Sequence, residues 1–395
     1  MSLTSPIYLD NAATSHPKPE AVYRAVDAAL RQGGSAGRGS HQQGLSAERI
    51  LFSTREALAR LFNAPTSAGF IFTQNATHAL NQALFGLLVP GDRVVTTSVE
   101  HNAVIRPLRA LADTGVEVVK VAADGRTGQV CHAALQAACN AAPTRLLVIN
   151  HASNVFGSLQ CLDGLGAWCR HRGILLLVDG SQTAGLVPID LQQLQIDLFA
   201  APGHKGLLGP QGTGFLYLRE GITLRPLIYG GTGANSHSDR QPELLPERLE
   251  SGTFNIPGLA GLHAGLSFLL ETGVAEIQAH EAHLAGRIIA GLGAIAGVTV
   301  HGPPAGTPRT AVVSFTLAQQ DPAAVGFYLD RQQIAVRTGL HCSPDSHRTF
   351  GTYPAGTVRV SPGYFTSTAQ IDDFLEQVAV ISRTAADRSP AVPRS

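Results

Sequence analysis

The stretch Ile174-Leu175-Leu176-Leu177-Val178-Asp179-Gly180-Ser181-Gln182 is apolar without interruption up to Val178 and then changes abruptly to a carboxylate. An apolar run of this length predicts a strand that is buried on both faces of a parallel sheet. Ligands of open α/β sheets bind beyond the carboxyl ends of the strands. We therefore expect the Asp179 carboxylate to face a functional site.

A second short strand, predicted over residues 196–201, is followed by Pro202-Gly203-His204-Lys205 and is expected to bring Lys205 to the same edge of the sheet. An aspartate and a lysine placed in this way suit pyridoxal phosphate (PLP). The amine forms a Schiff base with the cofactor, and the carboxylate keeps the pyridine nitrogen protonated. The alternative is an ordinary strand-end aspartate and a surface lysine.

The segments before this pair alternate between the helical and the strand pattern. Strands are predicted over 69–73, 93–97, 116–121 and 145–150, and helices over 20–32, 47–62, 76–88, 102–113 and 132–141. This βαβ rhythm predicts an α/β fold with a mostly parallel sheet that is flanked by helices on both faces. The Gly- and Ser-rich segment 33–44 is predicted to be a loop.

The pattern changes after Tyr229. A Gly-rich loop over 230–238 and a Pro-punctuated stretch over 242–257 lead to long helices over 258–270 and 274–295 and to short strands near 298–300, 311–315 and 357–360. We expect an N-terminal segment (1–15) that packs with the smaller domain, a large domain (16–257), a smaller α+β C-terminal domain (258–384) and a tail (385–395) without regular structure.

Composition narrows the class of protein. The 395 residues carry 29 basic and 29 acidic side chains with no basic stripe, which argues against nucleic acid or an anionic membrane as a partner. No apolar stretch reaches the length of a membrane span. The five cysteines form no Cys-x-x-Cys pair, so neither a disulfide framework nor a metal site is expected, and a reducing cytoplasm is the expected location.

Further polar residues follow other predicted strands, and each has a structural alternative. Ala76 and Thr77 open a helix whose N–H groups suit a phosphate, although Asn75 alone would cap it. His101 can stack on a flat ring or cap a helix. The amides of Asn154 and Gln182 can contact a ligand or close turns.

Cys342 lies in Arg337-Thr338-Gly339-Leu340-His341-Cys342-Ser343-Pro344, a polar loop that is unlike the apolar surroundings of the other cysteines. Cationic neighbours favour the thiolate, which is the nucleophilic form of cysteine. Arg359 can form a fork with a substrate carboxylate or an ordinary salt bridge at a strand edge.

From Tyr8-Leu9-Asp10-Asn11-Ala12-Ala13 to Arg359-Val360-Ser361-Pro362-Gly363, the chain resembles fold-type-I PLP enzymes of the class V aminotransferase type, in the cysteine desulfurase and selenocysteine lyase group. The most specific motifs are Val178-Asp179-Gly180-Ser181-Gln182, Gly203-His204-Lys205 and Arg337-Thr338-Gly339-Leu340-His341-Cys342.

The resemblance implies a role for each matching residue. Lys205 is the Schiff-base lysine, Asp179 the partner of the pyridine nitrogen, His101 the ring-stacking residue, and Cys342 the nucleophile that forms a persulfide. It also implies further contacts: to the ring-oxygen side (Asn154, Gln182), to the phosphate (Ala76, Thr77, Ser181, His204), to the phosphate of a partner subunit in a homodimer (Thr253), and to the substrate (Arg359, Arg337, Asn154).

The chain departs from the family pattern at three positions. Pro202 replaces a frequent hydroxyl residue, so that one phosphate hydrogen bond is expected to be lost and Ser181 to compensate. His78 stands where the family often has Glu, and Leu340 replaces one of a His pair beside the cysteine. None of these changes removes a group that the chemistry requires.

The activity implied is desulfuration of L-cysteine to L-alanine, with a persulfide on Cys342 and transfer to a sulfur-acceptor protein. A selenocysteine lyase uses the same residues, and a C–S lyase that releases pyruvate uses Lys205 and Asp179 without Cys342. A docking module with little free turnover is a further alternative, for which the segments 33–44 and 230–238 are the candidate surfaces.

Overall fold

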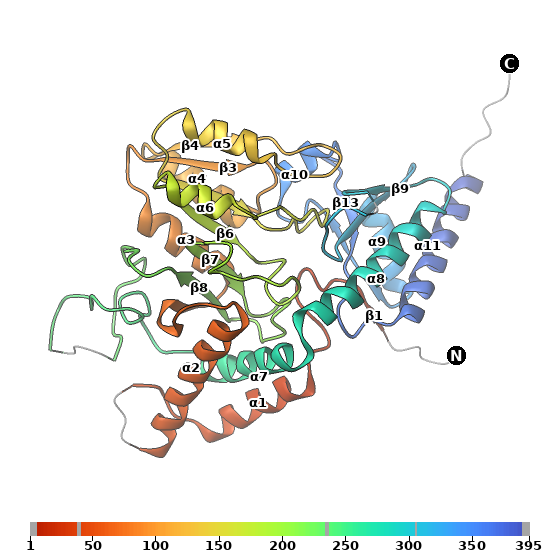
Figure 1. The fold of residues 1–395 in the computed structure, drawn as a ribbon. Coiled ribbons are helices and arrows are strands. Elements are labelled where there is room, and N and C mark those ends of the chain that lie inside the picture. Colours follow the sequence, from red (N-terminus) through yellow and green to blue (C-terminus); the bar gives the residue numbers. More distant parts are fainter. Residues whose placement is uncertain (1–5, 38–40, 234–236, 305, 389–395) are drawn as a thin grey trace.

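The computed structural model describes residues 6–37, 41–233, 237–304 and 306–388, arranged as a large α/β part beside a smaller one (Figure 1). The helices are α1 (Glu20–Gln32), α2 (Gln42–Leu61), α3 (Ala76–Leu87), α4 (Asn102–Ala112), α5 (His132–Asn140), α6 (Leu165–His171), α7 (Ile256–Thr272), α8 (Val274–Gly293), α9 (Pro322–Arg331), α10 (Pro344–Thr349) and α11 (Thr368–Arg388). The strands are β1 (Ile7–Tyr8), β2 (Phe70–Thr73), β3 (Arg93–Thr97), β4 (Glu117–Val121), β5 (Leu146–Asn150), β6 (Leu175–Asp179), β7 (Leu198–Pro202), β8 (Gly214–Leu218), β9 (Val298–His301), β10 (Val313–Leu317), β11 (Ile334–Ala335), β12 (Arg337–Gly339) and β13 (Thr357–Val360).

The large part is built on a seven-stranded sheet with the order β2-β8-β7-β6-β5-β3-β4. Strand β8 runs antiparallel to its neighbours β2 and β7, and every other adjoining pair is parallel. The predicted mostly parallel sheet is therefore confirmed, and the apolar run that ends at Asp179 is its central strand β6. The sequence analysis did not identify β8.

Alternate residues of the central strands face opposite layers of helices, because successive side chains of a strand point to opposite faces. Leu176 and Val178 pack into a core with residues of α2, α5, α6 and α7, whereas Leu177 packs with residues of α3 and α4. Burial on both faces explains why β6 is uniformly apolar rather than alternating.

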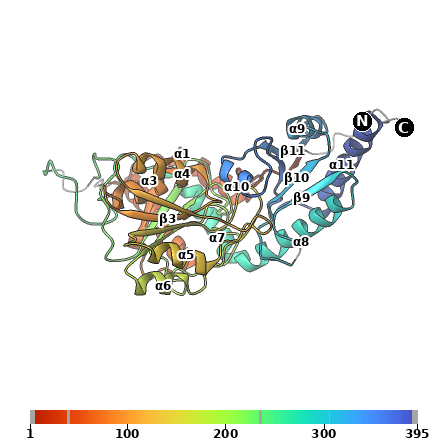
Figure 2. The ribbon, with the colours of Figure 1, turned by 90° about the horizontal axis from the view of Figure 1, so that it is seen from above.

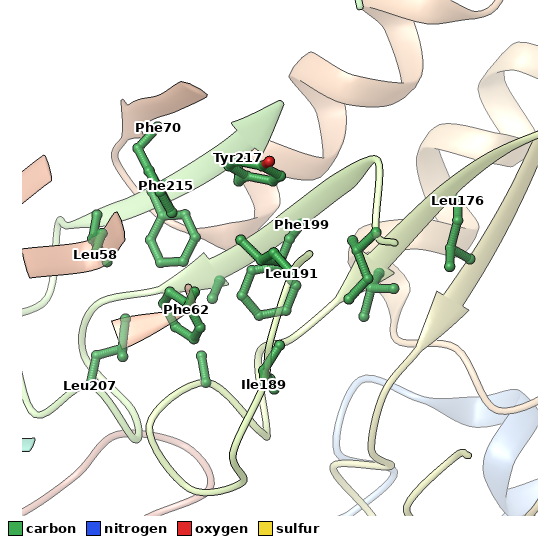
Figure 3. Packing of buried hydrophobic residues seen from close by; sticks show 14 of the residues in the cluster. Leu58, Phe62, Phe70, Leu176, Ile189, Leu191, Phe199, Leu207, Phe215 and Tyr217 are labelled. Carbon is green, nitrogen blue, oxygen red and sulfur yellow. The ribbon is translucent and has the colours of Figure 1, made fainter. Parts of the chain in front are cut away.

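A group of aromatic rings fills one end of the first core, where β2, β7 and β8 meet α2 (Figure 3). The centroid of the Phe199 ring lies 5.2 Å from that of Phe62 in an edge-to-face arrangement, and the Phe70 and Phe215 centroids are 5.4 Å apart. The Phe199 ring also packs against Gly180, where a Cβ would lie 2.2 Å from a ring carbon. The core thus reaches the residue that follows Asp179.

The smaller part has an antiparallel sheet with the order β12-β13-β10-β9, and α8, α9 and α11 contribute to its core (Figure 2). The N-terminal segment joins this part: β1 pairs in parallel with β11, and Ile7 and Leu9 enter the same core.

Helix α7 packs along α1 and α2 beneath the large sheet (Figure 1). Its residues Leu259, Leu262, Leu266 and Leu269 belong to the core of the large part. This packing favours a domain boundary near Gly273, between α7 and α8, rather than the predicted boundary after Pro257. Sequence pattern alone gave no such signal, because α7 is apolar on most of its surface.

Two predicted loop boundaries differ from the structure. Helix α2 begins at Gln42, inside the segment 33–44, with the His41 side chain accepting a hydrogen bond from the Gly44 N–H. Helix α11 continues to Arg388, so the expectation that the tail from 385 lacks regular structure is wrong for 385–388. Alanine is the strongest helix former, so Ala385 and Ala386 favour this continuation of the helix. Residues 38–40, 234–236 and 389–395, on which parts of the loop and tail predictions fall, lie outside the described residues.

Within the described ranges, no single helix combines the length and apolarity that a membrane span needs; α7 and α8 pass together by length and composition, but they are bent by 84° at the break between them.

We expect Phe199→Ala to lower the free energy of unfolding by about 3–5 kcal/mol, because it leaves a cavity among the aromatic rings. Denaturant unfolding of the two proteins measures the difference. Phe327→Ala, at a side chain that is 66% exposed on α9, is the matched control and is expected to change stability by less than about 0.5 kcal/mol. Equal effects of the two substitutions would contradict the central place of Phe199 in the core.

Candidate active site

The parallel topology brings the predicted strand-end residues to one edge of the large sheet. The carboxyl ends of β2, β3, β5, β6 and β7 lie there, and each is followed closely by a polar group: Thr77, His101, Asn154, Asp179 and Lys205, respectively. Residues from positions 77 to 205 are thus collected at one site by strand direction alone.

The Asp179 carboxylate is buried and fixed by the residue two positions later. Its Oδ1 atom accepts hydrogen bonds from the Ser181 N–H at 2.9 Å and from the Ser181 hydroxyl at 2.5 Å. Among the described residues, Oδ2 takes no hydrogen bond, which leaves it available to a ligand N–H. The Ser181 hydroxyl is therefore engaged with Asp179 in the structure, and its expected contact with the phosphate stays a prediction.

Burial lowers the pKa of the Lys205 amine to about 8. The negative charge of Asp179 opposes this shift, whereas the positive charges of Arg359 and Arg337 add to it. A lysine with such a pKa is substantially deprotonated at mildly alkaline pH, and the neutral amine is the form that attacks a carbonyl or accepts a proton.

The imidazole of His101 is held as a neutral ring. Its Nδ1 atom accepts a hydrogen bond from the Ala103 N–H at 3.0 Å, so that the residue caps α4 as the structural alternative supposed. Burial lowers the pKa of His101 to about 4, against the opposing charge of Asp179. A neutral ring with Nδ1 fixed as an acceptor is suited to stacking on a flat ligand.

The first turn of α3 combines a cap with unused donors. Asn75 Oδ1 accepts from the His78 N–H at 2.9 Å, while the N–H groups of Ala76 and Thr77 donate to no described residue. His204, which directly precedes Lys205, has a buried Nδ1 atom that has no hydrogen-bond partner among the described residues. Burial lowers the pKa of His204 to about 4. Free N–H groups at a helix start and an unpartnered imidazole nitrogen both suit an anion.

Cys342 is exposed at the tip of a tightly anchored turn. His341 and Cys342 have φ angles of 49° and 59°, in the left-handed region that is costly for residues with a side chain. The Asn154 amide donates to the His341 carbonyl at 2.6 Å, and the Asn102 N–H donates to the Cys342 carbonyl at 2.9 Å. The cysteine is thus fixed beside His101 although the two are far apart in the sequence.

The amides predicted to contact the ring oxygen have protein partners. Gln182 Nε2 donates to the Ala12 carbonyl at 3.0 Å, and Asn154 Nδ2 is engaged with His341. The Oδ1 atom of Asn154 is buried without a partner. Asn154 therefore connects the cysteine turn to the large sheet, in addition to any contact with a ligand.

Arg359 and Arg337 are cross-strand neighbours in register on β13 and β12. The guanidinium of Arg359 is buried and donates to Asp10 Oδ1 at 2.6 Å and to the Asn154 carbonyl at 2.9 Å. Arg337 makes no ion pair with any described residue. The structure therefore brings the three predicted substrate contacts, Arg359, Arg337 and Asn154, together, and of the two arginines only Arg337 is without an ion pair among the described residues.

Thr253 is exposed and lines a pocket together with Gln74 and His78, which flank the start of α3. The surface that was predicted to face a partner subunit thus lies beside the predicted phosphate contacts of the same chain.

Two acidic residues, Glu100 and Asp10, form part of the site although the sequence analysis did not predict them there. Glu100 is buried between β3 and β5: its Oε1 accepts from Thr97 Oγ1 at 2.7 Å and from the Asn150 N–H at 3.0 Å, and its Oε2 has no partner. Burial, and to a lesser degree the charge of Asp179, raises the pKa of Glu100 to about 8. A carboxyl directly after a buried strand was the available signal. The other residue is Asp10, through its pair with Arg359.

These observations are compatible with PLP. The unused Asp179 oxygen, the Lys205 amine with its lowered pKa, the neutral His101 ring and the free N–H groups of α3 match the four parts of that cofactor: ring nitrogen, aldehyde, ring face and phosphate. Among the described residues, no group of three or more His, Cys, Asp or Glu side chains is placed to hold a metal ion.

The fold and the site define an α/β enzyme of the PLP fold-type-I class. The sequence model of the aminotransferase class-V family matches residues 7–374. A relative from Methanothermobacter thermautotrophicus called "Probable cysteine desulfurase" is 34% identical over 384 residues, which cover 94% of each chain. A "Cysteine desulfurase" from Yersinia pseudotuberculosis is 34% identical over 348 residues, covering 85% of this chain and 84% of the relative.

Among solved structures, the apo structure of a cysteine desulfurase from Thermococcus onnurineus matches with a TM-score of 0.89 and 30% identity, covering 96% of this chain and 95% of that one. The chain therefore belongs to the aminotransferase class-V family, in its cysteine desulfurase branch.

We expect Glu100→Gln to flatten the dependence of stability on pH. Because the pKa of the folded-state carboxyl is raised to about 8 from 4.5, its contribution to stability is complete below pH 4.5 and is lost as the pH rises through 8. One such group changes the free energy of unfolding by at most about 1.4 kcal/mol per pH unit. Denaturant unfolding between pH 5 and 8.5 compares the two proteins, and parallel profiles would show that Glu100 is not the titrating group.

Proposed function

We propose that this chain is a PLP-dependent cysteine desulfurase, which converts L-cysteine to L-alanine and leaves a persulfide on Cys342. The observation that carries the proposal is the anchoring of the exposed Cys342 turn to Asn154 and Asn102, which follow β5 and β3, through the Asn154–His341 and Asn102–Cys342 hydrogen bonds. A nucleophilic thiol that is fixed beside a PLP site is needed for sulfur transfer and is not needed for transamination.

In this proposal, the chain's residues hold the cofactor at the four points named above. Lys205 anchors the cofactor, Asp179 Oδ2 accepts from the ring nitrogen, His101 covers one ring face, and Ala76, Thr77 and His204 contact the phosphate. The bound cofactor supplies an electron sink for the bond that is broken at the substrate's Cα. Asn154 and Gln182 would contact the ring-oxygen side, in addition to their hydrogen bonds with the His341 and Ala12 carbonyls.

The remaining steps belong to the side chains. Arg359 and Arg337 orient the substrate carboxylate. The neutral Lys205 amine would remove the proton from Cα of the substrate, which its lowered pKa favours. The Cys342 thiolate attacks the substrate sulfur: a sulfur–sulfur bond forms, the carbon–sulfur bond breaks, and its electron pair stays with the substrate carbon, which is then protonated to give alanine.

A homodimer is the assembly that this reading favours. Thr253 and the apolar side chains of Leu227, Ile228, Tyr229 and Leu244 are exposed on the same side as the start of α3. Of these side chains, Ile228 lines the same pocket as Thr253, and exposed large apolar side chains are a feature of interfaces. In the dimer, Thr253 is expected to reach the phosphate bound by the partner subunit.

We further propose that an acceptor protein receives the sulfur in a reducing cytoplasm, which agrees with five free cysteines. The two suspected docking loops meet in the structure, because Ala36 and Gly37 line one pocket with Thr232 and Gly233. They form a single surface rather than two.

The products formed from L-cysteine test the proposal. PLP-loaded protein incubated with L-cysteine and a thiol reductant is expected to release alanine and sulfide in equal amounts. Pyruvate in place of alanine would identify a C–S lyase. Alanine formation that is much faster from L-selenocysteine, measured as kcat/KM, would identify a selenocysteine lyase.

We expect Cys342→Ser to retain PLP binding, seen as unchanged cofactor absorbance, and to lose at least about 100-fold in the rate of sulfide release, because the acceptor thiol is gone. Cys131→Ser, at a second exposed cysteine, is the matched control and is expected to behave as the unmodified protein. Undiminished sulfide release by Cys342→Ser would exclude the persulfide role.

A further inference from the structure

Arg359, which the family resemblance assigns to the substrate carboxylate, already binds the carboxylate of Asp10 in the same chain. Arg359 lies within β13 between the core residues Val358 and Val360. Its guanidinium donates from Nη2 to Asp10 Oδ1 at 2.6 Å and from Nη1 to the Asn154 carbonyl at 2.9 Å. A substrate carboxylate that binds Arg359 must therefore share the guanidinium with the Asp10 carboxylate or displace it.

The Asp10 carboxylate lies against the Nη2 atom of the Arg359 guanidinium. The Asp10 side chain is 19% exposed, whereas that of Arg359 is 2% exposed. The Nε atom of Arg359 is enclosed by protein and has no hydrogen-bond partner. Because the more exposed partner of the pair is Asp10, a carboxylate that arrives from solvent reaches the guanidinium on the side where Asp10 is bound.

The backbone, and not the ion pair, holds Asp10 in this position. The Ser361 N–H donates to the Leu9 carbonyl at 2.8 Å, the Asn11 N–H donates to the Ser361 carbonyl at 3.1 Å, and the Ala12 N–H donates to Ser361 Oγ at 2.9 Å. Residues 9–12 are thus fastened along Ser361 on both sides of Asp10. A change of the Asp10 carboxylate to an amide leaves all three of these hydrogen bonds intact.

The surrounding charges leave room for one more anion. Arg337 is the cross-strand neighbour of Arg359 and forms no ion pair within the described part of the chain. The two guanidinium groups therefore share a single carboxylate, that of Asp10. A monocarboxylate ligand would balance the second positive charge, and it would do so next to Asp10, where like charges repel.

We propose that Asp10 is an internal competitor for the substrate carboxylate: it occupies Arg359 in the empty site, shares or yields this guanidinium when an α-amino acid binds, and thereby weakens substrate binding. This inference rests on the proposed function, because it concerns the amino-acid substrate of the same site. Asp10 is a positioning and specificity residue in this scheme, since it acts through Arg359 and the substrate contacts Arg359 itself.

Removal of the competing charge has opposite effects on the empty and the occupied site. Asp10→Asn keeps the size of the side chain and an oxygen that accepts from Arg359 Nη2. The empty protein loses the counter-ion of a buried arginine and becomes less stable. A bound carboxylate then supplies the missing negative charge, so that the variant binds carboxylates more tightly than the unmodified protein does.

The test compares PLP-loaded enzyme with the D10N variant. We expect D10N to lower KM for L-cysteine by about three- to tenfold, with a smaller change in kcat, as for removal of one competing charged partner. Independently of turnover, L-alanine and propionate are expected to raise the melting temperature of D10N more than that of the unmodified protein. A D10N variant with a raised KM and a smaller thermal response to propionate would overturn the proposal, because it would show that Asp10 only orients Arg359.

Asp27→Asn is the matched control, because it makes the same substitution in an exposed ion pair with Arg31 on α1. It is expected to change neither KM nor the response to propionate, and an equal response in D27N would overturn the proposal. If D10N does not fold, Asp10→Ser removes the same charge and carries the same predictions. The propionate measurement does not depend on desulfuration: if the unmodified protein does not desulfurate L-cysteine but D10N still responds more strongly to propionate than the unmodified protein does, the proposed function is refuted and the role of Asp10 is supported.

Discussion

The hydrogen bond from the Asn154 amide to the His341 carbonyl, 2.6 Å long and buried, holds the two halves of the site together. Asn154 follows β5 of the large sheet, and His341 precedes the cysteine of the smaller part. The backbone carbonyl of the same Asn154 accepts from Arg359, so that a single residue fixes both the cysteine turn and the carboxylate-binding arginine. Reactive groups contributed by separate parts of the chain can reach a common geometry only through such shared anchors.

Most charges of the site are compensated by burial or by a partner, and Arg337 is the exception among the described residues. Lys205, Arg337 and Arg359 are positive, and Asp179 and Asp10 are negative. Burial and the two arginines lower the pKa of Lys205, while the carboxyl of Glu100 is kept neutral up to about pH 8 by burial. Because Glu100 is neutral, Asp179 is the anion beside the predicted position of the cofactor ring. Asp179 can therefore act as the partner of the ring nitrogen without competition from a second carboxylate.

Sequence alone predicted the central elements well, since their signals are local. The uniformly apolar β6 and the alternation around it specify a parallel sheet, and strand direction then places Asp179, Lys205 and His101 at one edge. What could not be predicted depends on contacts between distant segments. Helix α7 is apolar almost all round and could pack on either part. Strand β8, by contrast, carries a local signal that was missed, the short apolar and aromatic run Phe215-Leu216-Tyr217-Leu218. The anchoring of Cys342 depends on Asn102 and Asn154, which lie about 190–240 residues away in the chain.

The pair of Asp10 and Arg359 shows most clearly where inference from motifs ends. The motifs identify Arg359 as a candidate ligand of the substrate carboxylate and give Asp10 no role. Only the fold shows that the segment after β1 runs beside Ser361 and sets the two charged groups 2.6 Å apart. A buried arginine without that carboxylate would carry an unpaired charge, which is strongly destabilising, so the empty site needs Asp10. The same carboxylate stands in the way of the substrate. Stability of the empty site and affinity for the substrate are thus opposed at one residue, and the N-terminal segment sets the balance between them.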